Sequence, residues 1–345
     1  MINSDFIKGM PKIDLHCHLD GSLPIPTAKR ILKDLGEEWD EEILFEKMGV
    51  ADECPSLAAY LACFDLPIRC LQTADALELC ARDMAVKAAG ENTVYLEARF
   101  APSTQLLGGL SVKGAIEAVD RGLKRAEKET GIITGIIVCA MRHLPEETNL
   151  AMFRQAREML GAGVSACDLA GDEASFPMKG FRNLFEEARR LGLPFTVHAG
   201  ECGSRANIRE AIDLGALRIG HGTAASGDPA LMKLAADRGV GFEQCPTSNI
   251  QTKILSDYSL TPVREFMRAG IPVSVGTDNR TVSRVTLTEE FTRLSAFSGL
   301  TRKEAEKIYF DSVSMAFAGD DVKEKLLRKG RDFFERQGGS EETGL

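Results

Sequence analysis

The segment IDLHCH (residues 13–18) is a short apolar run that ends in two histidines, and it is the first of eight segments that we predict to be strands. Longer stretches with helical periodicity separate these segments, and such alternation implies parallel strands joined by right-handed crossovers. Eight units of this kind in about 265 residues are typical of the (β/α)8 TIM barrel, an α/β fold. The predicted strands are Ile13–His18, Val94–Ala101, Ile132–Met141, Val164–Leu169, Phe195–Ala199, Leu217–Gly220, Val240–Gln244 and Val273–Gly276.

Glycine follows several of the helical patterns directly before the next strand, which is the usual end of a helix. An open, doubly wound sheet is the alternative architecture, but no G-x-G-x-x-G motif follows the first predicted strand. The predicted helices of this part are Val112–Thr130, Glu146–Leu160, Gly180–Leu191, Ala206–Leu214, Pro229–Arg238 and Pro262–Ala269, and the glycines are Gly131, Gly192, Gly215, Gly239 and Gly270.

The connection between the first two predicted strands is unusually long. Connections of this length are often lids, and this one leaves from the strand end at which barrel active sites lie. We therefore predict that residues 20–92 form a helical insertion over the site, and an added packing layer is a compatible alternative. Its helical patterns are Pro26–Leu35, Glu41–Met48, Ser56–Phe64 and Ala74–Ala89.

The chain continues after the last predicted strand with three helical patterns, Leu287–Phe297, Arg302–Phe317 and Asp320–Arg336. The polar residues 338–345 are predicted to be a disordered tail. Because the sequence has neither an internal repeat nor a low-complexity linker, we expect residues 1–345 to form a single domain.

Composition narrows the range of partners. The 345 residues carry a net charge of −9 at pH 7, whereas nucleic-acid binding requires a basic surface. No apolar run approaches the about 18 residues of a membrane span, and we expect no secretory signal. The nine cysteines are scattered without a C-x-x-C motif, which is typical of reduced thiols. We expect a cytoplasmic protein with a small-molecule partner, and the sequence leaves its oligomeric state open.

Histidine is scarce, and four of the five histidines lie at or just beyond the carboxyl end of a predicted strand. His16 and His18 are two residues apart, so both side chains point to the same side of their strand. His198 ends the fifth strand, and Asp278 ends the eighth, which is next to the first in a closed barrel. Three histidines and one aspartate form a donor set that suits zinc, and iron or manganese are alternatives.

Two further side chains are placed to move protons beside that donor set. Glu201 follows His198 by three residues, and His221 ends the sixth predicted strand. Metal-assisted hydrolysis needs a base for water and an acid for the leaving group. A solvated loop carboxylate and a structural histidine are the alternatives. Gly171 could let a ligand approach the backbone or only form a turn, and Asp20 could bind a substrate hydroxyl or cap a helix.

Seven segments in this order resemble the motifs of the adenosine deaminase family, within the amidohydrolase superfamily. The resemblance extends from about residue 10 to residue 317 and implies a (β/α)8 barrel with one zinc ion. It also implies hydrolysis of adenosine and 2′-deoxyadenosine to inosine, or deoxyinosine, and ammonia. The segments are HCHLDGSLP (16–24), MRH (141–143), DLAGDE (168–173), HAGE (198–201), GHGT (220–223), CPTSN (245–249) and GTDN (276–279).

The resemblance assigns a role to each matching residue. It implies that Glu201 donates a proton to purine N1 and that His221 orients and helps to deprotonate the attacking water. It also implies that Gly171 N–H contacts the purine and that Asp20 meets the ribose 5′-hydroxyl. The zinc ligands would be His16, His18, His198 and Asp278, and an apolar wall near the nucleoside would comprise Leu57, Leu61 and Phe64.

One position departs from the family pattern, because Asn279 stands where the family usually has a second aspartate. A carboxyl group must be protonated to donate to purine N7, whereas an amide donates without this requirement. The replacement leaves base selectivity open, so adenine and modified 6-aminopurine nucleosides are alternative substrates. A nucleotide is disfavoured because Asp20 would repel a phosphate.

Two alternatives come from other classes of protein. The cytidine-deaminase type of zinc enzyme needs H-x-E and P-C-x-x-C motifs, which this sequence lacks. A non-catalytic barrel that serves as a binding module would be expected to lose these side chains, yet all of them are present.

Overall fold

The computed structural model describes residues 1–50, 54–55 and 57–338, and the side chains of residues 57 and 58 lie outside the description. The strands in this part of the chain form two parallel sheets, ordered β1-β2-β3-β4 and β5-β6-β7-β8. Each strand agrees with its prediction to within one residue at either end. The strands are β1 (Lys12–His18), β2 (Thr93–Phe100), β3 (Ile133–Met141), β4 (Val164–Ala170), β5 (Thr196–Ala199), β6 (Arg218–His221), β7 (Gly241–Gln244) and β8 (Val273–Val275).

Isolated parallel bridges connect the edges of the two sheets. Cys17 in β1 pairs with Asp278, which follows β8, and Cys167 in β4 pairs with Phe195, which precedes β5. The backbone of Asp278 exchanges two hydrogen bonds of 2.7 Å with β1. The predicted parallel α/β architecture is therefore confirmed, with strand pairing divided into two sheets.

The helices between these strands begin and end where the sequence indicates. Ser111 and Ser204 accept hydrogen bonds from backbone N–H groups in the first turns of α7 and α10. The five predicted glycine stops all have positive φ, and Gly131 ends α7 at φ 78°. These helices are α7 (Val112–Thr130), α8 (Glu146–Glu158), α9 (Arg182–Arg190), α10 (Arg205–Asp213), α11 (Pro229–Asp237) and α13 (Val263–Arg268).

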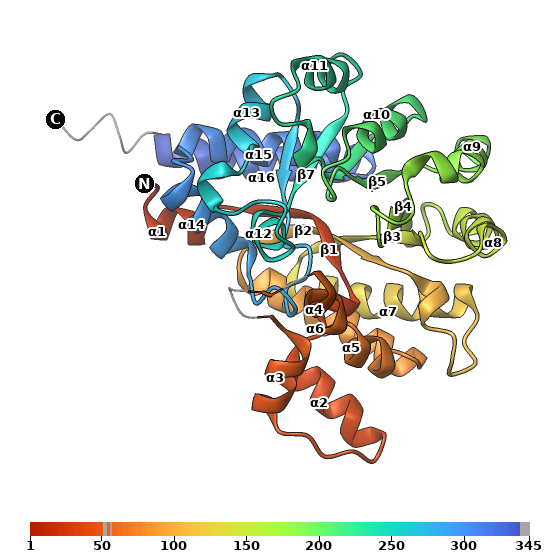
Figure 1. The fold of residues 1–345 in the computed structure, drawn as a ribbon. Coiled ribbons are helices and arrows are strands. Elements are labelled where there is room, and N and C mark those ends of the chain that lie inside the picture. The colour runs from red at the N-terminus through yellow and green to blue at the C-terminus, as the bar shows by residue number, and fades with distance from the viewer. Residues whose placement is uncertain (51–53, 56, 339–345) are drawn as a thin grey trace.

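The described part of the connection between β1 and β2 is helical, as predicted, and it includes a helix that the sequence patterns do not indicate. That helix, α5, carries Pro67 in its first turn, where the missing proline N–H breaks no intrahelical hydrogen bond. Figure 1 shows α2 and α3 projecting from the body of the molecule. The helices are α2 (Ile25–Asp34), α3 (Glu41–Met48), α4 (Leu57–Ala62), α5 (Asp65–Cys70) and α6 (Ala74–Gly90).

The first helix, α1 (Ser4–Gly9), lies beside the end of the last helix, α16 (Asp320–Gly338) (Figure 1). The ring of Phe6, in α1, packs against that of Phe333 with 5.4 Å between centroids. The last helix includes Gly338, the first residue of the predicted tail, and residues 339–345 lie outside the described residues. The remaining helices are α1 (Ser4–Gly9), α12 (Pro246–Gln251), α14 (Leu287–Phe297), α15 (Arg302–Met315) and α16 (Asp320–Gly338).

The packing of the strands brings their carboxyl ends together around a continuous core. All eight residues of β2 are buried, as expected of parallel sheets covered on both faces. One hydrophobic cluster extends from Ile2 to Phe334 and includes residues of both sheets. None of the described helices has the length and apolar character needed to cross a bilayer.

Candidate active site

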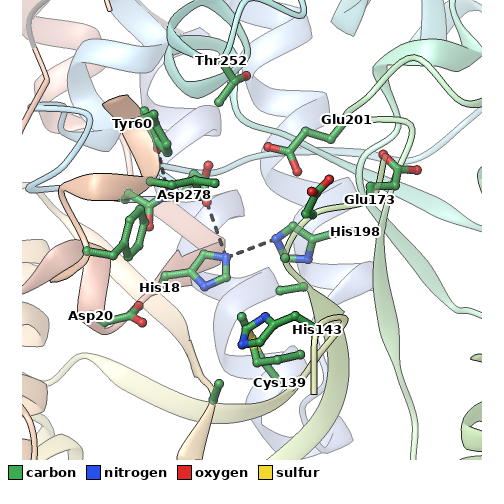
Figure 2. A pocket seen from close by; sticks show the side chains of 18 of the residues that line it. His18, Asp20, Tyr60, Cys139, His143, Glu173, His198, Glu201, Thr252 and Asp278 are labelled. Carbon is green, nitrogen blue, oxygen red and sulfur yellow. Dashed lines mark hydrogen bonds and ion pairs between the residues drawn. The ribbon is translucent and has the colours of Figure 1, made fainter. Parts of the chain in front are cut away.

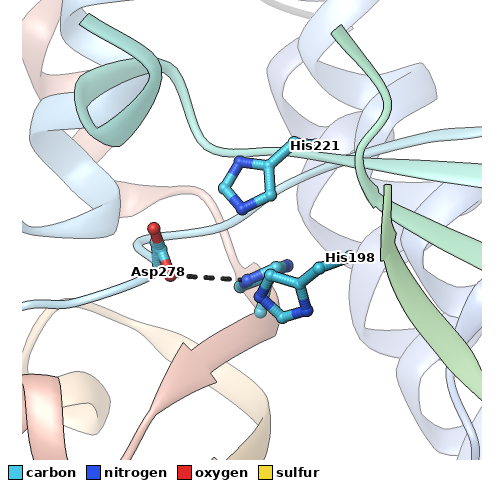
Figure 3. A group of neighbouring side chains, drawn as sticks. His198, His221 and Asp278 are labelled. Carbon is cyan, nitrogen blue, oxygen red and sulfur yellow. Dashed lines mark ion pairs between the residues drawn. The ribbon is translucent and has the colours of Figure 1, made fainter. Parts of the chain in front are cut away.

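A cluster of histidine and aspartate side chains lies at the carboxyl ends of the strands. His16, His198, His221 and Asp278 are buried, and one ligand atom from each lies within 4.8 Å of the others. Figure 3 shows His198, His221 and Asp278 turned toward one another. These residues come from four separate strand ends, so the fold forms a buried metal-binding site from distant parts of the chain.

His18 completes the predicted donor set and lies on the open side of this cluster. Its Nε2 is 3.1 Å from His198 Nε2 and 3.5 Å from Asp278 Oδ1. Figure 2 shows His18 with its ring directed toward both residues. The structure thus brings His16, His18, His198 and Asp278 together, and His221 belongs to the same group.

Carboxylates behind two of the histidines determine which ring nitrogens face the site. His16 Nδ1 donates to Glu243 Oε2 at 2.7 Å, and His198 Nδ1 donates to Asp168 Oδ2 at 2.9 Å. Each bond leaves Nε2 directed to the cluster. His16 Nε2 is buried and makes no hydrogen bond within the described part of the chain. A metal ion would satisfy this nitrogen, so the donor set fits the predicted ion.

Arg99 joins these two carboxylates. Its guanidinium donates to Asp168 Oδ2 at 2.9 Å and to Glu243 Oε2 at 2.8 Å, and all three side chains are fully buried. Arg218 donates to Glu243 Oε1 at 2.6 Å. Burial raises the pKa of Glu243, but Arg99 and Arg218 outweigh this effect and hold that pKa well below its usual range. Glu243 therefore stays ionised and remains an acceptor for His16.

His221 is oriented by a different partner. Its Nδ1 lies 2.9 Å from Asn249 Oδ1, which can only accept, so Nδ1 donates and Nε2 carries the lone pair. That Nε2 is 3.7 Å from Glu201 Oε1. His221 and Asp278 also have left-handed backbones, with φ values of 61° and 57°. Such backbones cost about 1 kcal/mol or more and concentrate at functional sites.

A glycine provides the space for the His16 ring. A Cβ atom on Gly220 would lie 3.0 Å from His16 Cε1 and 3.4 Å from His198 Cα. Any larger residue would therefore displace one of the two histidines. This close packing explains why glycine directly precedes His221 at the end of β6.

The cluster opens into a cavity of about 480 Å³, within the usual range for small-molecule sites. Glu201 lines it from the loop after β5, and Asp20 lines it from the turn after β1 (Figure 2). Burial raises the pKa of Asp20 to about 6, so the carboxyl is mostly ionised at neutral pH. Gly171 also lines the cavity and has φ 102°, a conformation that favours glycine.

Helix α4 and the turn after it supply the apolar side of the cavity. Leu61 and Phe64 line it, whereas the prediction for Leu57 concerns a side chain outside the described residues. Asn279 lines the same cavity and donates from Nδ2 to the Tyr60 hydroxyl at 2.9 Å. The side chain that we predict to face the purine base is thus an amide that already contacts Tyr60, which belongs to the insertion between β1 and β2.

The sequence of this chain is similar to those of known proteins over most of its length. Residues 11–331 match the family model described as adenosine deaminase. The chain is 38% identical over 325 residues to the adenosine deaminase of Enterococcus faecalis, covering 94% of this chain and 96% of the relative.

The chain belongs to the adenosine deaminase family.

Solved structures related to this family share its fold. The adenine deaminase of Arthrobacter aurescens superposes with a TM-score of 0.87 at 24% identity, covering 95% of this chain and all of that one. The N6-methyl-AMP deaminase of Arabidopsis thaliana superposes with a TM-score of 0.84 at 25% identity, covering 96% of this chain and 98% of that one. The fold of this family therefore accommodates proteins named for a base, a nucleoside and a nucleotide.

Sequence reasoning missed several residues behind the site. Arg99 and Glu243 lie 144 residues apart, so their pairing has no local sequence signal. Arg99 stands in a mostly apolar strand, and a charged residue in such a strand is buried only with partners. This position was the one signal in the sequence that could have indicated a buried ion pair. Asn249, in the segment after β7, is a further residue behind the site, since its Oδ1 lies 2.9 Å from His221 Nδ1.

Proposed function

We propose that this chain hydrolytically deaminates adenosine and 2′-deoxyadenosine to the corresponding inosines and ammonia. The observation that carries the proposal is the buried histidine and aspartate cluster, with Glu201 beside it in a small-molecule cavity. The 38% identity to an adenosine deaminase supports the substrate class. We further propose that residues 1–345 form one domain and that the eight strands act as a closed (β/α)8 barrel, with residues 20–92 as its lid.

The proposed metal is one zinc ion per chain, held by His16, His18, His198 and Asp278. Three imidazoles and one carboxylate suit zinc, and His16 Nε2, which makes no hydrogen bond within the described residues, lies 3.4 Å from Asp278 Oδ1. When bound, zinc would supply Lewis-acid activation of water.

The side chains beside the metal site are assigned to proton transfer. His221 accepts a proton from the attacking water at Nε2, because Nδ1 is committed to Asn249. Glu201 delivers a proton to purine N1 as water adds and C6 becomes tetrahedral. The proton held by His221 then passes to the 6-amino group, Glu201 takes the proton of the C6 hydroxyl, and ammonia leaves as C6 becomes a carbonyl. The 3.7 Å between His221 Nε2 and Glu201 Oε1 allows both side chains to reach one substrate.

The cavity favours a nucleoside over a nucleotide. The described residues that line it include six carboxylates and neither lysine nor arginine, so nothing positive faces a phosphate. Asp20 would meet the ribose 5′-hydroxyl, Gly171 N–H would contact the purine, and Asn279 would donate to N7. Adenine and a modified 6-aminopurine nucleoside are the second candidates, because Asn279 departs from the family pattern at the base.

A substrate panel tests the proposal. Purified protein is incubated with adenosine, 2′-deoxyadenosine, adenine, N6-methyladenosine or AMP, and loss of substrate is followed by absorbance and liquid chromatography. We expect the first two to be hydrolysed with much the highest kcat/KM, and a chelator to abolish turnover until zinc is restored. A preference for adenine or for AMP would overturn the substrate assignment. Less than about half a metal ion per chain, with no turnover after zinc addition, would favour a binding module.

Replacement of Glu201 tests the assigned proton donor separately. Glu201→Gln preserves shape but cannot deliver a proton, so we expect kcat to fall by about 10²–10⁴-fold while adenosine still binds. Near-normal turnover would exclude Glu201 from this role without affecting the metal assignment.

A further inference from the structure

Glu173 is a buried carboxylate that follows the neighbouring strand, β4, and forms hydrogen bonds to the loop that carries Glu201. It is 4% exposed. Its Oε1 accepts a hydrogen bond from Gly200 N at 2.7 Å, and its Oε2 accepts one from Cys202 N at 2.8 Å. One side chain therefore binds the two backbone N–H groups that flank Glu201.

The same loop also packs closely against helix α10, which limits its movement toward that helix. Gly200 has φ 78°, and a Cβ there would lie 2.5 Å from Ile208 Cδ1, so this turn is packed against α10. Asn207, also in α10, donates from Nδ2 to Glu173 Oε1 at 2.9 Å. Asn207 thus fixes the Glu173 carboxylate, and the two oxygens of that carboxylate hold the backbone of residues 200 and 202.

The Glu201 side chain itself has much less support. It is about one-quarter exposed, and its Oε1 approaches His221 Nε2 only to 3.7 Å. Figure 2 shows Glu173 and Glu201 next to each other at the edge of the cavity. The position of the Glu201 carboxyl therefore depends mainly on its backbone, and Glu173 supplies charge-assisted hydrogen bonds to that backbone on both sides.

We propose that Glu173 is a positioning residue that acts through Glu201, by holding the 200–202 loop where the Glu201 carboxyl reaches purine N1. The inference rests on the proposed function, in which Glu201 delivers a proton. Misplacement of a reacting group by about 1 Å can cost about 10²-fold in rate, so a loop clamp of this kind contributes to turnover rather than to binding alone.

The main test is Glu173→Gln, which preserves size but offers one acceptor in place of two. We expect kcat for adenosine to fall by about 10–100-fold while KM changes by less than about threefold. Amide hydrogen exchange of the 199–203 segment should accelerate, because Gly200 N or Cys202 N loses its acceptor. Metal content should match that of the wild type.

Glu265→Gln is the matched control. Glu265 accepts hydrogen bonds from Gly227 N at 2.9 Å and Ser226 Oγ at 2.5 Å, in the loop after β6 and outside the cavity. We expect this variant to lose a similar amount of stability and to keep its kcat. An equal decrease of kcat in both variants would mean that Glu173 only fastens a loop.

A double-mutant cycle with Glu201→Gln separates the two proposals. If Glu173 acts through Glu201, adding Glu173→Gln to Glu201→Gln lowers kcat by less than about threefold further. A full multiplicative decrease would overturn the positioning role and leave the proton donor intact. Normal turnover of Glu201→Gln alone would overturn the donor assignment and this inference with it.

Asn207→Ala provides a second variant should Glu173→Gln not fold. It removes one donor to Glu173 Oε1, and we expect kcat to fall by about two- to tenfold without a matching change in KM. An unchanged kcat, with the 199–203 amides exchanging faster, would overturn the proposal.

Discussion

The charged network behind the histidines and the residues over the cavity differ in chemical character, and we call them the floor and the roof. The floor, which we define as Arg99, Asp168, Arg218 and Glu243, is a fully buried network of charges behind the histidines. The roof, which we define as Tyr60, Leu61 and Phe64, is mostly apolar, and Leu61 is 47% exposed.

The difference indicates which part of the site is responsible for which property. Arg99 bridges Asp168 and Glu243, and Arg218 adds a second ion pair to Glu243. These charge-assisted hydrogen bonds fix the floor in one geometry, which suits the orientation of metal ligands. The roof combines apolar contacts with one hydroxyl, which suits the fit of a base. Changes in the floor should therefore affect stability and metal binding, and changes in the roof should affect substrate selection.

The largest effect is expected from Arg99→Met in the floor. The substitution removes the guanidinium that pairs with Asp168 and one of the two that pair with Glu243, and both carboxylates are in the interior. Breaking a buried pair in this way costs about 3–5 kcal/mol, which urea unfolding would measure. Arg82→Met, at the surface pair with Glu129, is the control and should cost at most about 1 kcal/mol. Similar losses in the two variants would contradict a special role for the floor.

The next effect is expected from Asp168→Asn. The amide weakens the hydrogen bond to His198 Nδ1 and removes a charge facing Arg99. Loss of such a partner typically lowers metal affinity by about 10–100-fold, and competition with a chromophoric chelator would measure zinc affinity. Asp237→Asn, at an exposed pair on α11, should leave the affinity unchanged. An unaltered zinc affinity in Asp168→Asn would separate the floor from the metal site.

The strand ends were predictable from sequence, whereas the floor was not. Periodicity and glycine stops are local signals, so the ends of β1 and β5 and their histidines could be placed from single segments. The partners of Arg99 come from β4 and β7 and become neighbours only when the sheets form. The roof was predictable only in part. The family resemblance implied Leu61 and Phe64, whereas no sequence signal indicated the contact between Tyr60 and Asn279.

Glu290 is a buried carboxyl outside the floor, and it can be compared with Glu243, a buried carboxyl within the floor. It accepts a hydrogen bond from Thr247 N at 3.1 Å, and its Oε2 has no hydrogen-bond partner in the described residues. Burial raises the pKa of Glu290 to about 8, whereas Arg99 and Arg218 hold that of Glu243 low. The guanidinium partners of Glu243 thus account for the opposite directions in which the pKa values of these two buried carboxyls shift.

This contrast predicts a pH dependence of stability. Between about pH 4.3 and pH 8 the folded state keeps the Glu290 proton that the unfolded state has lost, so rising pH lowers stability by up to about 1.4 kcal/mol per unit. Glu290→Gln cannot ionise and should flatten the dependence between pH 6 and pH 8, measured by urea unfolding. Glu289→Gln, in the exposed capping box of α14, is the control and should preserve the wild-type slope. Identical slopes in Glu290→Gln and the wild type would mean that Glu290 is ionised in the folded protein.

The smallest effect is expected from Tyr60→Phe in the roof. The Tyr60 hydroxyl accepts from Asn279 Nδ2 at 2.9 Å and lies 2.9 Å from Ser283 Oγ, so it orients the amide that we assign to purine N7. Loss of one such hydrogen bond corresponds to a rise in KM for adenosine of about two- to tenfold, with zinc affinity unchanged. Tyr258→Phe, which removes a hydroxyl bonded to Thr247 and Arg293 away from the cavity, should leave KM unaltered.

The outcome for Tyr60 decides whether the roof selects the base by shape or by orienting a donor. An unchanged KM in Tyr60→Phe would mean that the apolar contacts of Leu61 and Phe64 suffice and that Asn279 is held by its own backbone. A rise in KM for adenosine that is absent for 7-deazaadenosine, which lacks the N7 acceptor, would locate the effect at the Asn279 amide. With zinc affinity unchanged, the metal site and the base site would then be separable by substitution.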